Sequence, residues 1–316
     1  MEYFLSLNPV SLFRALPGSI AQGMIWGIMA LGVYITYRLL DFADLTVDGS
    51  IATGAAVSVM LIRGGVSPIL SLPVAFLAGM LAGFVTGLLN TALGIPGILA
   101  SILTQLSLYS VNLVIMGKAN QPVSVDNYPL VVSLRYVTDG SVLSKLLFFA
   151  AFALFLVVLV AVMYWFFGTE LGQAIRATGC NGNMARAQGI NTDFIKVLCL
   201  MLANGMVGLC GAFYAQFQGA SDVNMGRGAI VIGLAAVIIG EVLFGKFAAK
   251  RKHAFAFILV SVILGAVIYY MVYQFVLWLK MPSDYMKMFS AIVVAVFLAV
   301  PYLKEKRALK KGVAKA

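Results

Sequence analysis

The segment Gly64–Gly117 contains no Asp, Glu, Lys or Arg. A helix needs roughly 20 apolar residues to cross the hydrocarbon core of a bilayer, so this segment is long enough for two. Of the 316 residues in the chain, 62% are hydrophobic and 11% are charged, against about 45–50% and about 25% in a soluble domain. A soluble fold of this size cannot bury so much apolar surface. The sequence therefore predicts an integral membrane protein, and it excludes a soluble enzyme, a disordered chain and a nucleic-acid-binding protein.

Other stretches with little or no charge predict the remaining membrane helices. The segment Asn90–Gly97 contains Gly94 and Pro96 and divides the long apolar stretch into two helices, because Gly and Pro end helices. We expect an all-α, polytopic fold with about 8–10 spans, formed by residues 1–316 as a single domain. Besides this pair, the expected spans are Pro17–Tyr37, Gly49–Ile62, Leu146–Thr169, Val197–Ser221, Gly228–Gly245, Ala254–Leu279 and Met288–Leu303.

The net charge of +10 predicts the orientation of the chain rather than an acidic ligand. Cytoplasmic loops of membrane proteins are enriched in Lys and Arg. The densest basic clusters are Lys246–His253 and the tail 304–316, and such clusters suit an anionic cytoplasmic leaflet. With both clusters inside, alternation places Glu170–Lys196 and Arg38–Asp48 inside and Lys118–Lys145 outside.

The chain has three cysteines, a single histidine and no CxxC pattern, so we expect no metal site in it. No GxxxxGK[ST] phosphate-binding loop occurs, so we also expect no nucleotide cofactor in this chain. A membrane enzyme is a poor interpretation, since no HExxH sequence and no pair of acids on one helix are present.

The most informative polar segment is Gly168–Lys196, in which small, apolar and polar residues alternate at helical spacing. Gly179 is expected to end a first short helix as its C′ residue. Asn181 is expected to cap a second helix over Gly182–Gln188, which Gly189 closes. The segment thus predicts two short, stiff surface helices that can dock into a groove on a cytoplasmic partner.

A wider pattern runs through this loop: Gly172-x-x-Ile175-x-Ala177-x-Gly179-x-Asn181, then Arg186-x-x-Gly189-Ile190-Asn191 and Lys196. It resembles the cytoplasmic coupling loop of ATP-binding-cassette (ABC) importer permeases, in the family that includes branched-chain amino acid and ribose permeases. The resemblance extends to the glycine-rich segment Gly208–Tyr214 and to a first span at Gly18–Arg38. The family often has paired alanines where Asn183 and Met184 stand here, which favours contacts suited to a dedicated ATPase.

The resemblance implies the following division of labour. This chain would be a permease of the type II-like class in a bacterial inner membrane, paired within the lipid bilayer as a homodimer or with a sister permease. Two ABC ATPase subunits, which carry ATP and Mg²⁺, would dock at the coupling loops, and an extracytoplasmic substrate-binding protein would deliver the solute. The residues expected to couple to the ATPase are Gly172, Ile175, Arg176, Ala177, Gly179, Asn181, Arg186, Gly189 and Ile190.

Three further segments suggest the solute. Asp44–Ser50, Asp222–Gly228 and Gly233–Gly245 are similar to a subgroup of these permeases associated with the uptake of aromatic amino acids such as tryptophan or tyrosine. The resemblance therefore implies an amino acid as the solute, with an aromatic one as the narrower expectation.

Uncharged polar residues within the expected spans are candidates for a solute pathway, because they can solvate a moving zwitterion without holding it tightly. For each one alone, a hydrogen bond between helices is the simpler explanation. Thr104 and Gln105, which follow the broken segment Ile95–Gly97, are the strongest candidates. The full set is Gln22, Asn90, Thr104, Gln105, Asn112, Asn204 and Gln216.

Acidic residues near the membrane keep an alternative open. Glu241 lies in an expected span and Asp48 adjoins one, and an intramembrane acid is a functional candidate by default. Such an acid would fit an ion-coupled secondary transporter. For Asp48, the other explanation is a carboxylate at the positive start of a helix. The segment Asp222–Arg227, in the expected outer loop, fits either a docking site for the binding protein or a capped turn.

Overall fold

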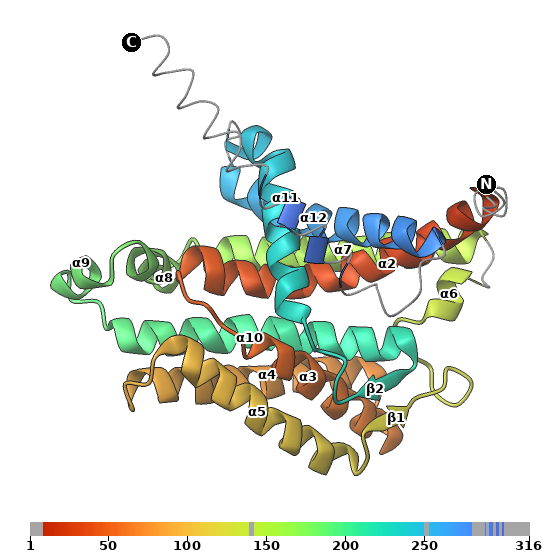
Figure 1. Ribbon diagram of the computed structural model, residues 1–316, viewed down its shortest axis with the longest axis horizontal. Helices are drawn as coiled ribbons and strands as arrows, with labels where there is room; N and C mark the ends of the chain where they lie inside the picture. Colours follow the sequence, from red (N-terminus) through yellow and green to blue (C-terminus); the bar gives the residue numbers. More distant parts are fainter. Residues whose placement is uncertain are drawn as a thin grey trace, which may run out of the picture.

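A computed structural model describes residues 9–138, 142–249 and 253–279, together with isolated helical positions between 288 and 299. Within these ranges the regular elements are helices apart from one two-stranded sheet. Figure 1 shows the elements in chain order as α2 (Pro9–Tyr34), the π-helical turn η1 (Ile35–Leu39), α3 (Val47–Arg63), α4 (Pro68–Thr91), α5 (Gly97–Met116), β1 (Asn120–Pro122), α6 (Leu134–Thr138), α7 (Val142–Phe166), α8 (Glu170–Cys180), α9 (Gly182–Ala187), α10 (Thr192–Gln218), β2 (Ala220–Asp222), α11 (Ala229–Ala249) and α12 (Ala254–Trp278).

Six helices in the described ranges are long and apolar enough to cross a membrane: Ser11–Leu39, Pro68–Thr91, Gly97–Met116, Leu143–Phe166, Thr192–Gln218 and Ala254–Trp278. Two more, α3 with 17 residues and the apolar part of α11, are shorter. The all-α polytopic fold predicted from the sequence is confirmed. The expected last span, Met288–Leu303, falls mostly outside the described residues, and so does the whole basic tail 304–316.

The predicted break in the long apolar stretch is also confirmed. Helix α4 ends at Thr91 and α5 begins at Gly97. Gly94 has a φ of +66°, a conformation that glycine adopts without steric cost. The Asn90 side-chain amide donates to the Ile95 carbonyl at 2.8 Å and holds the turn closed.

The connections gather at two ends of the bundle. At the first, which we call the α8 end, α8 packs against the chain at Leu39: a Cβ on Gly179 would lie 1.9 Å from the Leu39 carbonyl oxygen. At the other, the sheet end, β1 and β2 pair antiparallel with Asn120 opposite Asp222. The predicted alternation of loops requires Glu170–Lys196 and Arg38 at one end and Lys118–Lys145 at the other, as found here. The rest of the expected loop Arg38–Asp48 does not stay at the α8 end, because Asp44 bonds to Asn204 in the middle of α10.

Helix α10 occupies the centre of the bundle, between α2 and the layer of α3, α4 and α5 (Figure 1). Its glycines allow backbones to approach closely, which is a common basis of helix packing in membranes. A Cβ on Gly211 would lie 2.0 Å from the Ile51 carbonyl oxygen of α3, and one on Gly208 would lie 2.6 Å from the Ala75 carbonyl oxygen of α4.

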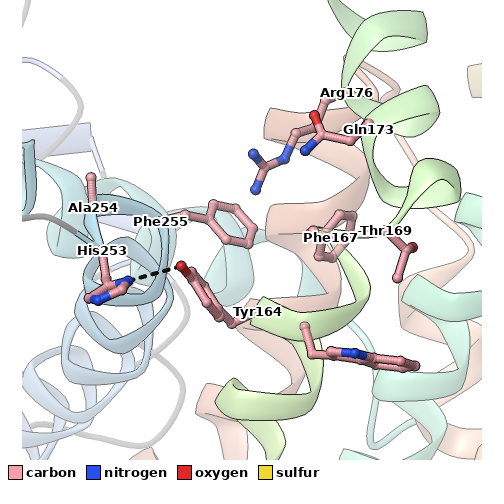
Figure 2. Close-up of a pocket in the computed structure, with 10 residues that line it drawn as sticks. Tyr164, Phe167, Thr169, Gln173, Arg176, His253, Ala254 and Phe255 are labelled. Carbon is pink, nitrogen blue, oxygen red and sulfur yellow. Dashed lines mark hydrogen bonds between the residues drawn. The ribbon is translucent and has the colours of Figure 1, made fainter.

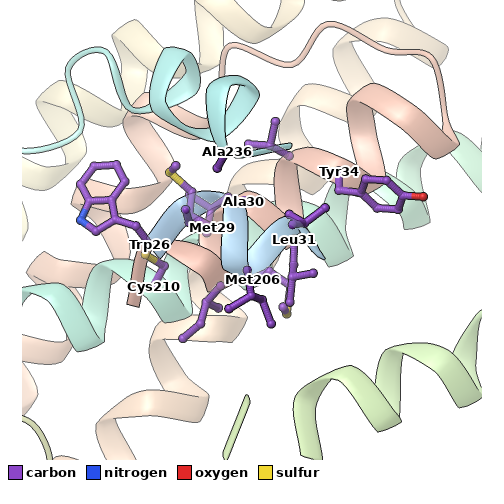
Figure 3. Packing of buried hydrophobic residues seen from close by; sticks show 14 of the residues in the cluster. Trp26, Met29, Ala30, Leu31, Tyr34, Met206, Cys210 and Ala236 are labelled. Carbon is purple, nitrogen blue, oxygen red and sulfur yellow. The ribbon is translucent and has the colours of Figure 1, made fainter. Parts of the chain in front are cut away.

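The face of α10 toward α2 combines one close approach, where a Cβ on Gly32 would lie 2.7 Å from the Ala203 carbonyl oxygen, with packing of larger side chains. Figure 3 shows Trp26, Met29 and Leu31 of α2 gathered with Met206 and Cys210, all of them buried. Cys210 packs as a small apolar side chain within this cluster.

Candidate coupling and pathway sites

Residues Gly168–Lys196, which we call the coupling knob, form two short helices that project at the α8 end (Figure 1). A side chain caps the start of each helix. The Thr169 hydroxyl accepts from the Gly172 amide at 3.4 Å, and the Asn181 side chain accepts from the Met184 amide at 3.0 Å. Asn191 caps the start of α10 in the same way. Each cap satisfies a backbone donor that the helix itself leaves unpaired, so the knob is a defined element rather than a loose loop.

The predicted cap at Asn181 is confirmed, and Gly189 follows the second helix with a φ of +83°. The predicted role of Gly179 as a C′ residue is wrong, because α8 continues through it to Cys180. Gly179 is needed where α8 touches the Leu39 backbone, since any side chain would collide there. Gly172 has a similar role, for its Cβ would lie 2.4 Å from the Phe167 Cα.

The knob has a buried side and an exposed side. Ile175 is fully buried, Ile190 is half-buried and Ala177 is exposed. Three large apolar side chains face outward, and sequence reasoning connected only Met184 among them with docking contacts. They are Leu171, Met184 and Phe194, with exposed fractions of 44%, 58% and 56%.

Arg186, which the sequence suggests for ATPase contacts, is bound within the knob. Its Nε donates to the Thr192 hydroxyl at 2.6 Å, and its Nη2 lies 3.4 Å from an Asp193 carboxylate oxygen. The side chain is still about half exposed. It therefore ties the second short helix to the start of α10 and leaves part of its charge on the surface.

Arg176 points away from the tip of the knob, into a cavity of about 480 Å³ between the ends of α7, α8 and α12 (Figure 2). Its guanidinium carbon lies 3.9 Å from the ring centre of Phe255, which is a close cation–π contact. On the far side of the cavity the Tyr164 hydroxyl and His253 Nδ1 are 3.0 Å apart. Arg176 thus joins α8 to the first turn of α12.

Three of the predicted pathway residues tie helices or turns together. Asn90 closes the turn between α4 and α5. Asn204, fully buried, donates to the Asp44 carboxylate at 2.7 Å and accepts from the Ser50 hydroxyl at 2.6 Å. Gln216, also fully buried, accepts from the Val131 amide at 3.1 Å. Their hydrogen-bonding groups face protein partners.

The Asp44–Asn204 contact marks a place where two helices begin inside the bundle. Asn204 lies near the middle of α10, and α3 starts beside it at Val47 and runs to the sheet end. Helix α11 starts nearby at Ala229 and runs obliquely to the α8 end. We call the place where the two N-termini meet the helix junction. Discontinuous helices of this kind commonly surround the solute site in transporters.

Asp48 fixes the helix junction. Its two carboxylate oxygens accept from the Gly228 and Ile230 amides, both at 2.9 Å. The sequence suggests a carboxylate at the positive start of a helix, and the structure has one there, but the helix that it caps is α11. Glu241, which supports the ion-coupled alternative, is paired with Arg38 through two hydrogen bonds of 2.8 and 2.6 Å.

Two cavities lie beside the helix junction. The polar cavity, of about 210 Å³, is lined by Gln105 and Asn112 among others. The aromatic cavity, of about 340 Å³, is lined by Gln22 together with one Trp and four Tyr side chains. Thr104 is buried and bonds its own helix carbonyl at Ala100. The predicted pathway residues Gln22, Gln105 and Asn112 therefore reach cavities.

Arg227 lines both cavities. The sequence places it in the outer loop near Asp222 and Asn224, where the Asp222 carboxylate accepts from the Asn224 amide at 2.7 Å and forms a capped turn. The signal that could have singled out Arg227 is its position directly before the Gly228–Ala229 start of an apolar helix.

A bundle of apolar helices in which discontinuous helices begin beside two cavities is typical of membrane transport proteins. The chain belongs to the family described as branched-chain amino acid transport system, permease component, whose sequence pattern matches residues 16–300. It is a permease component of an ABC-type transport system and a multi-pass protein of the bacterial inner membrane.

Related transport proteins support this assignment. A tyrosine transport system permease protein of Clostridioides difficile is 39% identical over 88% of both chains. The inner membrane ABC transporter permease protein YjfF of Escherichia coli is 28% identical over 73% of this chain and 65% of its own. An autoinducer 2 import system permease protein of Yersinia pseudotuberculosis is 30% identical over 68% of this chain and 58% of its own. No solved structure matches the chain with significance.

Proposed function

We propose that this chain is the permease subunit of an ABC importer that brings an amino acid, specifically an aromatic one, into the cytoplasm. Partner ATPase subunits dock on the coupling knob, and an extracytoplasmic binding protein delivers the solute at the sheet end. The observation that carries this proposal is the capped, two-helix knob with exposed Met184 at its tip.

The build of the knob suits the transmission of force. A coupling element must move as a body, because a flexible loop would absorb a displacement of the ATPase. The caps at Thr169 and Asn181 fix both helices, and the close contact of Gly179 with Leu39 seats the first helix on the bundle. Exposed apolar side chains on such an element are typical of an interaction surface.

The charge pattern supports a cytoplasmic α8 end. Helix α12 begins at this end, directly after the basic segment Lys246–His253. The positive-inside rule places such a segment in the cytoplasm. The knob then faces the compartment that holds ATP, and the sheet end faces the binding protein.

The proposed class of solute is supported by the tyrosine transport system permease that is 39% identical to this chain over most of its length. As in other ABC importers, we infer a pair of permeases, here a homodimer, with ATP and Mg²⁺ bound by the partner ATPases. The ion-coupled alternative loses its main support, because Glu241 is engaged by Arg38 and is therefore a poor free proton carrier.

The coupling surface is tested by replacing Met184. We expect Met184→Glu to reduce co-purification of the ATPase and ATP-dependent uptake of labelled L-tyrosine by at least about tenfold, because it places a charge in an apolar contact. Met184→Leu, which keeps an apolar side chain of similar volume, is the matched control and should behave as the wild type. Both variants are compared for yield and thermal unfolding in detergent, since an exposed residue should not change either.

Two results would overturn the proposal. Unchanged ATPase binding and uptake in Met184→Glu would refute the knob as the docking surface. Uptake by the permease alone, driven by a proton or sodium gradient in liposomes without ATPase, would refute the importer mechanism.

A further inference from the structure

The helix junction has a site that the coupling proposal does not use. At the junction, the N-termini of α3 and α11 meet through the Asp48 carboxylate. Gly226 allows this approach, since a Cβ there would lie 1.9 Å from the Asp48 carbonyl oxygen. Arg227 follows directly, and it lines the polar cavity on one side and the aromatic cavity on the other.

Each cavity contains a buried polar group that lacks a hydrogen bond. Asn112, on the polar cavity, is 1% exposed, and neither its amide nitrogen nor its amide oxygen has a partner among the described residues. Trp26, on the aromatic cavity, is 3% exposed, and its indole nitrogen is likewise without one. Buried polar groups are nearly always hydrogen-bonded, so both groups point to a ligand or to water that completes the site.

Arg227 supplies an available positive charge. It is exposed, and it forms no ion pair within the described ranges. A guanidinium binds a carboxylate through two parallel hydrogen bonds. The nearby starts of α3 and α11 add positive potential, although Asp48 offsets part of it.

The aromatic cavity suits a planar ring. Trp26 packs edge-on against Tyr214, with ring centres 5.2 Å apart, and in a tilted arrangement against Tyr270, at 5.6 Å. Gln22 donates to the Tyr214 hydroxyl at 3.4 Å, so the walls combine aromatic faces with fixed polar edges. A volume of about 340 Å³ lies within the range of small-molecule sites, roughly 300–1,000 Å³.

We propose that the aromatic cavity and Arg227 form a binding site for a free aromatic amino acid, with its ring among the Trp and Tyr side chains and its carboxylate on the Arg227 guanidinium. The α-ammonium group then faces the polar cavity, where the Asn112 amide oxygen can accept from it. This inference rests on the proposed function, for it names the place in the permease that such a solute occupies.

The test measures binding to the permease itself, without the binding protein. The complex of permease and ATPase in nanodiscs is mixed with L-tyrosine, and saturation-transfer difference NMR records which ligand protons contact protein. We expect transfer to be strongest at the ring protons, to be displaced by L-phenylalanine, and to be weak for L-leucine and for L-tyrosinamide, which lacks the carboxylate.

Three variants and one control make the assignment specific. Arg227→Gln should lower the transfer signal at least about fivefold, because a charge-assisted pair is lost, whereas Arg227→Lys should retain part of it. Trp26→Phe keeps a ring but removes the indole donor, and it should weaken binding of L-tyrosine about two- to fivefold. Arg135→Gln removes another exposed arginine at the sheet end, paired with Asp126, and is the control that should bind as the wild type.

The outcomes separate this proposal from the proposed function. If wild type binds L-tyrosine and both Arg227→Gln and Trp26→Phe bind it equally well, the site is wrong. If L-leucine binds as well as L-tyrosine, the aromatic assignment is wrong. Neither result bears on the importer function, which is tested separately by ATP-dependent uptake. Should Arg227→Gln fail to purify as a folded complex, Trp26→Phe and Arg227→Lys still decide the question.

Discussion

Helices α7 and α10 are of similar length, but the structure uses them differently. The mean hydropathy of the most apolar window is 3.1 in α7 and 1.8 in α10, yet 22% of that window is buried in α7 and 61% in α10. Helix α7 has no glycine, whereas α10 contains Gly205, Gly208 and Gly211. Lipid accepts apolar side chains as readily as protein does. The position of a helix in the bundle therefore follows from its small and polar residues and not from its hydropathy.

The strongest test of this comparison inserts volume into each helix. Gly211→Leu should abolish the folded, monodisperse protein, because even a Cβ would lie 2.0 Å from the Ile51 carbonyl oxygen, a greater conflict than the overpacking that costs about 1–3 kcal/mol. Ala153→Leu, on an exposed position of α7, should change stability by less than about 0.5 kcal/mol. Size-exclusion yield and thermal unfolding in detergent measure both, and equal behaviour of the two variants would contradict the comparison.

A smaller effect is expected when a polar contact of α10 is removed. Asn204→Leu should lower the free energy of unfolding by about 3 kcal/mol, since it leaves the buried Asp44 and Ser50 side chains without their partner. Ser107→Ala is the control, because that hydroxyl is exposed and bonds only its own helix at Leu103. Unfolding in detergent mixtures measures both. A stability of Asn204→Leu equal to wild type would mean that the network does not hold α3 to α10.

The smallest effect is expected on α7. Phe152 packs edge-on against Phe213 of α10, with ring centres 5.4 Å apart. Phe152→Leu, which removes the ring contact but keeps a large apolar side chain, should cost about 1 kcal/mol. Val157→Ala, at a residue 63% exposed on α7, should cost almost nothing in the same unfolding measurement. A larger loss for Val157 than for Phe152 would mean that α7 packs on the bundle through its other face.

The sequence was sufficient for the features that depend on local chemistry. Apolar runs and the glycine and proline of Asn90–Gly97 determine where α4 ends and α5 begins. The cap at Asn181 depends on an amide three residues away. Gly179 was misread because its role depends on Leu39, which is distant in sequence and adjoins α8 only in the folded chain.

The candidate site was less predictable for the same reason. In the sequence, one amide within an apolar helix looks like another, as at Asn112, Asn204 and Gln216. Whether such a residue lines a cavity or bonds to a neighbouring helix depends on the groups that face it in the folded chain. Arg227 looks like an ordinary loop charge in the sequence. Its position between two cavities arises because α3 and α11 start deep in the bundle, and local sequence does not encode that depth.

The packing of α8 against Leu39 and Leu40 has a mechanical consequence. Residues 40–46 form a short non-helical strut that runs from this contact to the first turn of α3. The Asp44 carboxylate fixes the strut midway by accepting from the Thr46 amide at 2.9 Å, and Asp48 holds its far side to α11. Helix α8 meets Leu39 and Leu40 by packing, and from there residues 40–46 run as continuous chain to the point where α3 and α11 begin. A displacement of α8 would therefore reach the cavities beside the helix junction through one packed contact and one short stretch of backbone.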